Sequence, residues 1–251
     1  MARVDYNRAA GSYDQGRAHP LHVFDEWRVR LAEHLPLGAD GPVLDVGAGT
    51  GIWAGAIVAW FGLPVIALEP AAGMRAAARA KGLPSQVAIV GGDSQAIPLS
   101  GASCRAAWLS TVIHHIPDLG ACAAEVRRVL QPGAPVLIRS SFPGRHDEIP
   151  LFRFFPGAGR VARTFPTVDQ TVAAFSGAGF ALTSLERVHE QRDGTLADWV
   201  TRVQAVRHVD STLDTLTDEE FEAGLTTLQA AAAAREPVPP TGLDLLVLRP
   251  A

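Results

Sequence analysis

A glycine-rich turn that follows a short apolar run is the segment best suited to chemistry. It reads Val-Leu-Asp-Val-Gly-Ala-Gly-Thr-Gly from Val43 to Gly51, a pattern that predicts a buried strand ending in a turn that opens a helix. Glycine at alternate positions lets the backbone take positive φ angles and lets a ligand lie directly on the main chain. The sequence therefore predicts a ligand-binding turn at the end of this strand.

Two classes of ligand compete for this turn. The dinucleotide fingerprint G-x-G-x-x-G places a pyrophosphate at the N-terminus of the helix, but here the third glycine comes one residue early and position 52 is Ile. Asp45 lies just before the turn, and an unpaired carboxylate there would repel phosphate. The spacing and the carboxylate together favour a ligand with a cationic or amine group over a pyrophosphate.

Adjacent histidines follow the fourth predicted strand. His114 and His115 lie in the segment Thr111–Asp118, at the carboxyl edge of the predicted sheet, where doubly wound folds bind ligands. Imidazole titrates near neutral pH, which suits it to proton abstraction. We expect His115, and after it His114, as the candidate catalytic base; the alternative for both is a wall of the site.

The elements that must position these residues alternate between short apolar runs and helical patterns, the rhythm of an α/β protein with a parallel sheet. Helical patterns follow the first, second and fourth strands at 52–61, 71–81 and 119–130, while the third connection, 95–105, is short enough to hold only a turn. A helical stripe also occupies 21–35. The expected strands are Pro42–Val46, Pro64–Leu68, Gln86–Val90, Ala106–Ser110, Ala134–Arg139, Ala181–Val188 and Leu243–Leu248.

Two insertions interrupt this alternation. Residues 141–166 hold half of the ten phenylalanines of the chain, and residues 195–241 carry two helical patterns. A capping box at Thr217–Glu220 opens the second of these patterns. We find no internal repeat and expect one domain over residues 1–251.

The composition excludes several classes of protein. With 251 residues, 47% of them hydrophobic and 19% charged, the chain suits a folded domain rather than a disordered one. Its net charge is −4, and no basic stripe points to a nucleic-acid partner. No apolar run suits a membrane span, and the N-terminus has no secretory pattern. Cys104 and Cys122 offer neither a disulfide framework nor metal-ligand spacing. We expect a cytoplasmic protein, a monomer or homodimer, without metal.

The segment Asp45–Gly51 resembles motif I of the class I S-adenosylmethionine-dependent methyltransferases. Within them the chain is similar to the ubiquinone/menaquinone-biosynthesis-like group of small-molecule methyltransferases, over about residues 5–190. The resemblance implies a Rossmann-like, doubly wound, seven-stranded and mostly parallel sheet, with the last strand antiparallel and with helical lid insertions. It also implies S-adenosyl-L-methionine as cofactor and S-adenosyl-L-homocysteine as product.

The resemblance also assigns residues to the cofactor. Glu69, at the end of the second strand, would hold both ribose hydroxyls, and Pro70 and Met74 would flank the adenine. Asp93 would accept from the adenine amino group, and the backbone amide of Ser94 would meet a ring nitrogen. The remaining expected cofactor residues are Asp45, Gly47, Ala48, Gly49 and Gly51 along the turn and Ser110 through its carbonyl to the methionine amine.

The N-terminus completes the resemblance. Tyr6–Asp14 is similar to the family's Y-D-x-x-A-x-x-Y-D lid, with Asn7 in place of the first acidic residue. Tyr13 would close over the cofactor and Arg17 would pair with its carboxylate. We therefore expect lid helices over residues 1–37.

The activity that follows is transfer of a methyl group to a small, apolar or aromatic acceptor by in-line displacement. The insertions at 141–166 and 195–241 would form the acceptor pocket, with Phe142, Phe155 and Trp199 as contacts; a satellite core under a long loop is the alternative. Two other functions stay open: a protein that keeps the fold without transferring methyl, such as a cyclase or a partner-binding module, and a nicotinamide-dependent oxidoreductase.

Overall fold

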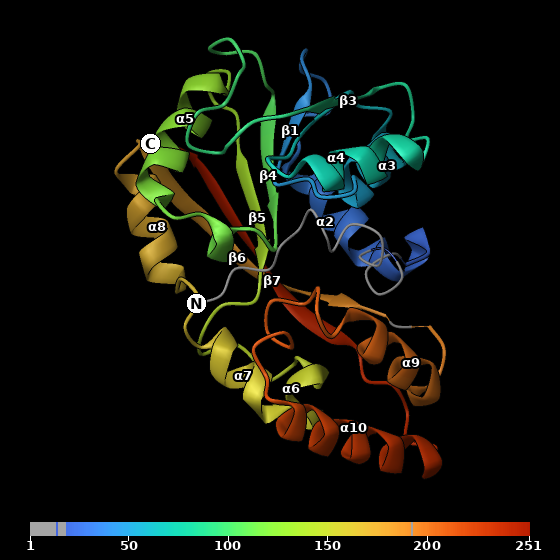
Figure 1. Ribbon diagram of the computed structural model, residues 1–251. Helices are drawn as coiled ribbons and strands as arrows, with labels where there is room; N and C mark the ends of the chain where they lie inside the picture. The colour runs from blue at the N-terminus through green and yellow to red at the C-terminus, as the bar shows by residue number, and fades with distance from the viewer. Residues whose placement is uncertain (1–13, 15–18, 192) are drawn as a thin grey trace.

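Short runs of aliphatic residues form the parallel part of a seven-stranded sheet. The structure is a computed structural model that describes Asp14 and residues 19–191 and 193–251. The strand order is β3-β2-β1-β4-β5-β7-β6 (Figure 1), and Val43 pairs with Val65 on one side and Ala106 on the other. The parallel strands are β1 (Val43–Val46), β2 (Val65–Leu68), β3 (Val87–Val90), β4 (Ala106–Ser110) and β5 (Val136–Ser140).

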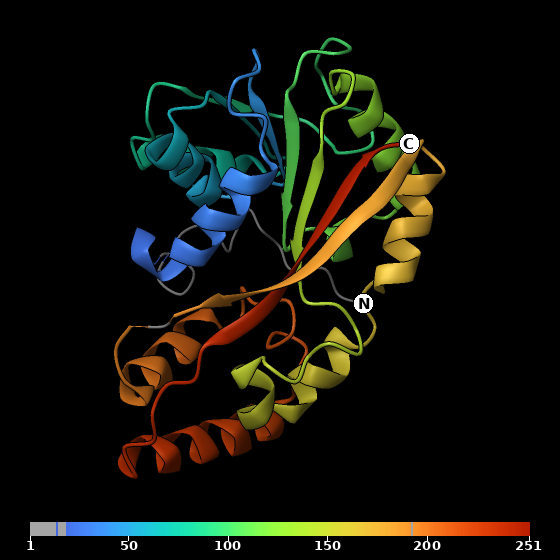
Figure 2. The same ribbon diagram turned by 180° about the vertical axis from the view of Figure 1, so that it is seen from behind.

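The last two strands close the other side of the sheet. β7 (Thr241–Pro250) lies between β5 and β6 (Phe180–Glu190) and is antiparallel to both. This confirms the expected sheet with an antiparallel last strand. Both strands are longer than their apolar runs predicted, and Figure 2 shows them extending beyond the ends of the parallel strands. Their extensions carry Glu190 and Thr241 to the site described below.

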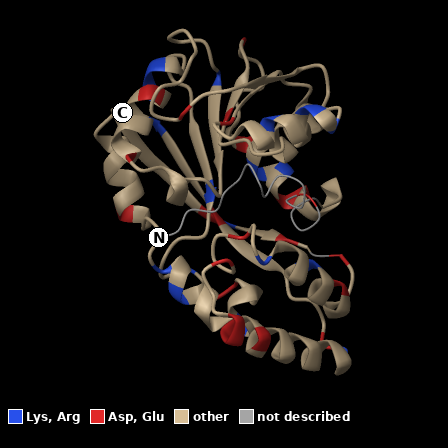
Figure 3. Cartoon of the chain, in the orientation of Figure 1, with Lys and Arg blue, Asp and Glu red and all other residues tan. Residues whose placement is uncertain are grey.

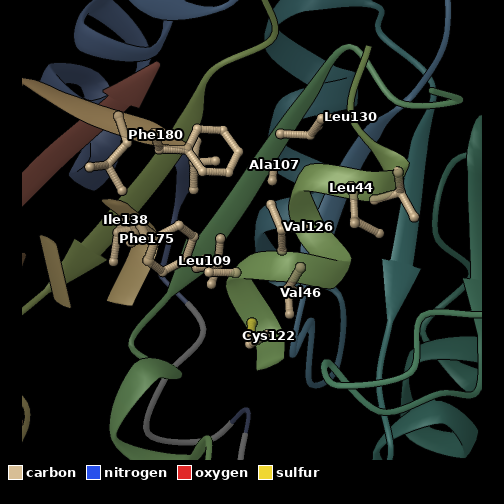
Figure 4. Packing of buried hydrophobic residues seen from close by; sticks show 14 of the residues in the cluster. Leu44, Val46, Ala107, Leu109, Cys122, Val126, Leu130, Ile138, Phe175 and Phe180 are labelled. Atoms are coloured by element: carbon tan, nitrogen blue, oxygen red, sulfur yellow. The ribbon is translucent and has the colours of Figure 1, made fainter. Parts of the chain in front are cut away.

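Helices cover both faces of the sheet. On one face lie α5 (Leu119–Val129) and α8 (Val168–Ser176). Figure 4 shows Cys122 and Val126 of α5 and Phe175 of α8 packed in one cluster with strand residues. On the other face lie η1 (Leu21–Phe24), α2 (Asp25–His34), α3 (Ile52–Phe61) and α4 (Ala72–Ala80).

The segment expected to form an N-terminal lid has a different role where the structure describes it. In α2, Trp27 and Leu31 are fully buried against the sheet. The Trp27 ring centroid lies 5.9 Å from the centroids of Trp53 and Trp108. Residues 25–34 therefore form a covering layer of the sheet, because their apolar stripe is used in this core, whereas Phe24 also lines the smaller chamber of the site described below. The rest of the expected lid, 1–13 and 15–18, lies outside the described residues.

A second group of helices, which we call the cap, lies beyond the carboxyl ends of the parallel strands (Figure 1). It consists of α6 (Pro150–Phe154), α7 (Pro156–Ala162), α9 (Leu196–Val206) and α10 (Asp218–Ala233). Its own apolar core contains Phe154, Phe155, Trp199 and Phe221. Among the helices of the described part of the chain, none has the length and apolar character needed to cross a membrane.

Capping interactions fix where the two long cap helices begin. The Thr195 side chain accepts from the Asp198 amide, and Thr217 does the same for Glu220, so both helices start with a capping box. Acidic side chains gather at the start of α10 (Figure 3), where they complement the positive end of the helix. The insertion expected from its sequence at 195–241 is thus a pair of helices joined by a loop.

Candidate functional site

A cavity of about 560 Å³ lies where β1, β2, β4 and β5 end, between the sheet and the cap. The doubly wound order places ligands at this edge. The expected site residues that line it are Gly47, Gly49, Glu69, Pro70, Met74, Asp93, Ser94, Ser110, His114, His115 and Trp199. Residues from all of the segments singled out between 45 and 115 therefore meet in one place.

A smaller chamber of about 160 Å³ adjoins this cavity. Asp45 and Ala48 line the smaller chamber, and Gly47, Ser110 and Trp199 line both. Gly51 is the N-cap of α3 and lines neither chamber. The two chambers together run along the turn from Asp45 to Thr50.

The turn needs its glycines for two reasons. Gly47, Gly49 and Gly51 have φ angles of 70°, 58° and 78°, which L-residues with a Cβ rarely adopt. A Cβ on Gly51 would lie 2.5 Å from Cδ1 of Leu83, and one on Gly47 would overlap Val112. The turn therefore needs glycine for its backbone angles and for its packing against Val112 and Leu83.

Glu69 joins the end of β2 to this turn. Its Oε2 accepts from the Gly49 amide at 2.9 Å and its Oε1 from the Ala71 amide at 2.8 Å. Burial raises the pKa of Glu69, and these two bonds and the charge of Arg75 oppose that shift. Each carboxylate oxygen can accept more than one hydrogen bond, so a fixed pair of acceptors faces the cavity and suits a vicinal diol.

Asp45 differs from what the sequence suggested. It is buried, and burial, followed by the charge of Glu69, raises its pKa to about 8. A carboxyl group with that pKa is mostly neutral at pH 7, so the argument that its charge would repel a pyrophosphate is wrong. The case against a dinucleotide then depends on the glycine spacing.

The loop after β3 supplies the far end of the cavity. Asp93 Oδ1 accepts from the Gln95 amide at 2.8 Å, an Asx turn that orients the side chain. Asp93 and Ser94 line the cavity together with Pro70 and with Met74, which is buried against the cap. An apolar slot with a polar end is a suitable place for a flat heterocycle.

The two histidines form a short 3-10 turn, η2 (Ile113–His115), directly after β4. Their ring centroids are 4.0 Å apart. His114 stacks on Phe165 at 4.0 Å with an interplanar angle of 9°, and its Nε2 lies 3.3 Å from Oγ of Ser211. His114 is thus contacted from both insertions, whereas His115 lines the same cavity beside it.

Two of the three side chains expected to contact the acceptor do not line the cavity. Phe142 is fully buried in the core between the sheet and α5, and Phe155 is buried in the cap against Phe221. Both take part in core packing instead of lining the cavity, so these two assignments are corrected. The phenylalanines that line the cavity are Phe152 and Phe165.

The cavity also contains a cluster of charged side chains that the sequence did not predict. Arg139 on β5 and Glu190 on β6 line both chambers and form a buried ion pair, and Asp210 joins them from the loop between α9 and α10. One signal was present: Arg139 is a charged residue in an otherwise apolar strand. Charged residues are seldom buried without a partner.

The expected lid residues Tyr13 and Arg17 lie outside the described residues. Asp14 of the same motif is described. Its Oδ1 accepts from Oγ1 of Thr50 at 2.5 Å, and its Oδ2 lies 2.7 Å from Nζ of Lys81. The motif is therefore attached to the glycine turn at this residue.

Comparison with known proteins agrees with this geometry. Residues 44–138 match the family model described as a methyltransferase domain. A malonyl-acyl-carrier-protein O-methyltransferase of Serratia marcescens is 33% identical over 149 residues, which are 57% of this chain and 54% of that protein. The chain thus spans about half the length of this curated relative.

Solved structures extend the likeness of fold to almost the whole chain. A protein of Anabaena variabilis, described as a methyltransferase of an antibiotic biosynthesis pathway, superposes with a TM-score of 0.74 at 18% identity, covering 93% of this chain and 100% of that one. The cyclase SpnF superposes with a TM-score of 0.64 at 18% identity, covering 98% and 93%. One architecture therefore serves proteins named for different reactions.

Proposed function

We propose that this chain, whose residues 44–138 match a methyltransferase domain and whose fold resembles that of a methyltransferase, is a class I S-adenosylmethionine-dependent methyltransferase that transfers the methyl group of S-adenosyl-L-methionine to a small-molecule acceptor. The observation that carries the proposal is one continuous cavity: Glu69 and the glycine turn lie at one part of it and His114, His115 and the cap at another. Donor and acceptor thus have room side by side.

The residues fit the cofactor in type and in setting. Glu69 offers paired acceptors to the ribose hydroxyls, the slot between Met74 and Asp93 suits adenine, and the bare turn at Gly47 and Gly49 suits the methionine part. Acidic groups around the cavity also suit a positively charged sulfonium. When bound, the cofactor supplies an electrophilic methyl group.

The protein's contribution is positioning, exclusion of water and proton transfer. The sheet edge and the cap hold the acceptor near the turn, and a fixed arrangement of two reactants contributes several kcal/mol to lowering the barrier. Where the acceptor is a hydroxyl or a carbon acid, His115 would take its proton, with His114 next to it. His114 is held by Phe165 and Ser211, which suits a wall role in addition.

The acceptor is proposed to be apolar or aromatic in its body. Phe152 and Phe165 line the cavity with Trp199, Leu151 and Ile149. Flat rings stack on such side chains, and apolar surface gains from leaving water. These residues come from both insertions and replace Phe142 and Phe155 as the proposed contacts.

Calorimetric titration with S-adenosylhomocysteine and, separately, with NAD⁺ and NADP⁺ tests the cofactor. We expect binding of the first and none of the nicotinamide nucleotides; the reverse result would contradict the proposal. Incubation with labelled donor and a panel of phenols, amines and carboxylic acids then tests the transfer. Cofactor binding without any labelled product would favour a protein that keeps the fold for another reaction.

A further inference from the structure

Arg139 is a buried cation at the centre of the site. It is the fourth residue of β5, a strand whose five residues are all buried. Its side chain is 9% exposed and lines both chambers. Of the described residues that line the larger cavity, it is the one Arg or Lys.

The guanidinium is held firmly from one side. Nε donates to Oε1 of Glu190 at 3.1 Å, Nη2 donates to the same oxygen, and Nη1 donates to Oγ of Ser110 at 3.2 Å. The rings of Trp27 and Trp53 lie 5.3 and 5.1 Å from its central carbon. Arginine has five N–H groups, so within the described part of the chain one N–H on each terminal nitrogen is left for a ligand.

Along the sheet edge Arg139 follows the proposed cofactor residues and contacts the last of them, Ser110. Following the order β3-β2-β1-β4-β5, the edge carries Asp93, then Glu69, then the glycine turn, then Ser110, and Arg139 last. The first four are the residues proposed for adenine, ribose, methionine and its amine. Arg139 comes after them, on the strand that leads into the insertion supplying Phe152 and Phe165, so it lies between the proposed cofactor residues and the proposed acceptor residues.

The chemistry of the group defines what it would bind. Two N–H groups on a planar fork match the two oxygens of a carboxylate. A single cation, already paired with Glu190, suits a monoanion better than a phosphate or diphosphate, which carries more charge. We propose that the methyl acceptor bears a carboxylate and that Arg139 binds it; this inference rests on the proposed function.

The test uses matched acid and amide probes on the protein saturated with S-adenosylhomocysteine. Benzoate is compared with benzamide, and 4-hydroxybenzoate with 4-hydroxybenzamide, by calorimetry. We expect at least one acid to bind about tenfold tighter than its amide, as a charge-assisted bidentate bond predicts. The preference should disappear in the double variant Arg139→Gln with Glu190→Gln, which removes both charges of this ion pair together.

Two further variants keep the result interpretable. Arg139→Lys keeps the charge but lacks the fork, so it should retain only part of the preference. Arg153→Gln is the matched control, because Arg153 is exposed and pairs with Glu236 outside the cavity, and it should behave as the wild type.

Three results would overturn the inference. The first is that the wild type prefers no acid over its amide, and the second is that the preference persists in the double variant. The third is that the double variant loses affinity for S-adenosylhomocysteine while its acid preference stays intact. The last result would assign Arg139 to the cofactor's own carboxylate. Failure of the wild type to bind S-adenosylhomocysteine contradicts the proposed function itself, whereas binding without an acid preference contradicts only this inference.

Discussion

Two carboxyl groups lie beside the glycine turn, and their surroundings give them different tasks. Glu69 faces the larger cavity and is fixed by two backbone amides. Asp45 faces the smaller chamber and is kept neutral by burial. At the scale of single residues, Glu69 thus presents its carboxyl oxygens to the larger cavity, whereas burial favours the neutral form of Asp45 in the smaller chamber.

Replacing Glu69 tests the proposed ribose contact. Glu69→Gln keeps the shape and one acceptor but loses the charge, so we expect S-adenosylhomocysteine to bind about 10–100-fold more weakly, in line with the roughly 1–3 kcal/mol of hydrogen bonds to a charged group. Calorimetry measures the affinity, and a melting curve serves as the control for folding. An unchanged dissociation constant in a folded variant would place the ribose elsewhere.

Asp45 predicts a pH dependence of stability. Its pKa rises from 3.8 to about 8 in the folded protein, so between these values the folded state holds a proton that the unfolded state has released. Stability contributed by this group therefore falls as pH rises from about 4 to about 8. Asp45→Asn imitates the neutral form and removes this loss.

We expect the melting temperature of Asp45→Asn, minus that of the wild type, to increase by several degrees across this interval, since each kcal/mol shifts the melting temperature of a chain of this size by roughly 2–4 °C. The other titrating groups are common to both proteins and cancel in the difference, except for Glu69, whose charge interacts with Asp45. A difference that stays constant with pH would show that Asp45 ionises normally in the folded state.

The two histidines are separated by comparing turnover with binding. If His115 is the base, His115→Ala lowers kcat by about 10²–10⁴-fold, the usual contribution of a general base, without weakening S-adenosylhomocysteine binding. His114→Gln should instead raise the KM of the acceptor, because His114 stacks on Phe165 in the wall of the cavity. Wild-type turnover in His115→Ala would remove the base assignment.

At the scale of elements, local patterns predicted the sheet lobe well and the cap poorly. The expected helix at 52–61 matches α3 at both ends, because it begins at a glycine and ends at another. The insertion at 141–166 reaches the cavity through Phe152 and Phe165, whereas Phe142 and Phe155, the expected contacts, are buried in cores. An apolar side chain in a core and one in a cavity wall look alike in sequence, and tertiary packing decides between them.

The packing of α10 on the cap makes a prediction about one glycine. A Cβ on Gly224 would lie 2.6 Å from Cε1 of Phe155. Although alanine favours helices by about 1 kcal/mol over glycine, Gly224→Ala should destabilise the protein by up to about 2 kcal/mol, because an overpacking cost of about 1–3 kcal/mol outweighs that gain. Thr227→Ala on the exposed face of the same helix is the control and should be neutral or stabilising. Chemical denaturation measures the free energy of unfolding of both variants. Equal stability of the two would show that the Phe155 side chain can move to make room.

At the scale of the whole molecule, the two halves of the site have different origins. The proposed cofactor half comes from contiguous motifs at 45–51, 69–74 and 93–94, so it could be predicted from the sequence. The proposed acceptor half combines Arg139, Glu190 and Asp210 from three distant segments. These three residues meet only because β6 is long and the cap is folded. No local sequence pattern predicts that they lie close together.

The cap and the sheet also have separate apolar cores, with Met74 of α4 packed in the cap's core. Few buried contacts between two cores allow one to open without the other. We therefore expect amides of α9 and α10 to exchange with deuterium faster than those of β1, β4 and β5 in the free protein. If S-adenosylhomocysteine binds between Met74 and the sheet edge, as proposed, it should slow exchange in the cap, since a ligand that contacts both parts stabilises the closed arrangement. Mass-spectrometric exchange with and without ligand measures this protection, and Glu69→Gln, at the same ligand concentration, should show less protection.

Protection confined to the sheet lobe would mean that the ligand does not connect the two parts, and the cap would then have to recognise the acceptor on its own.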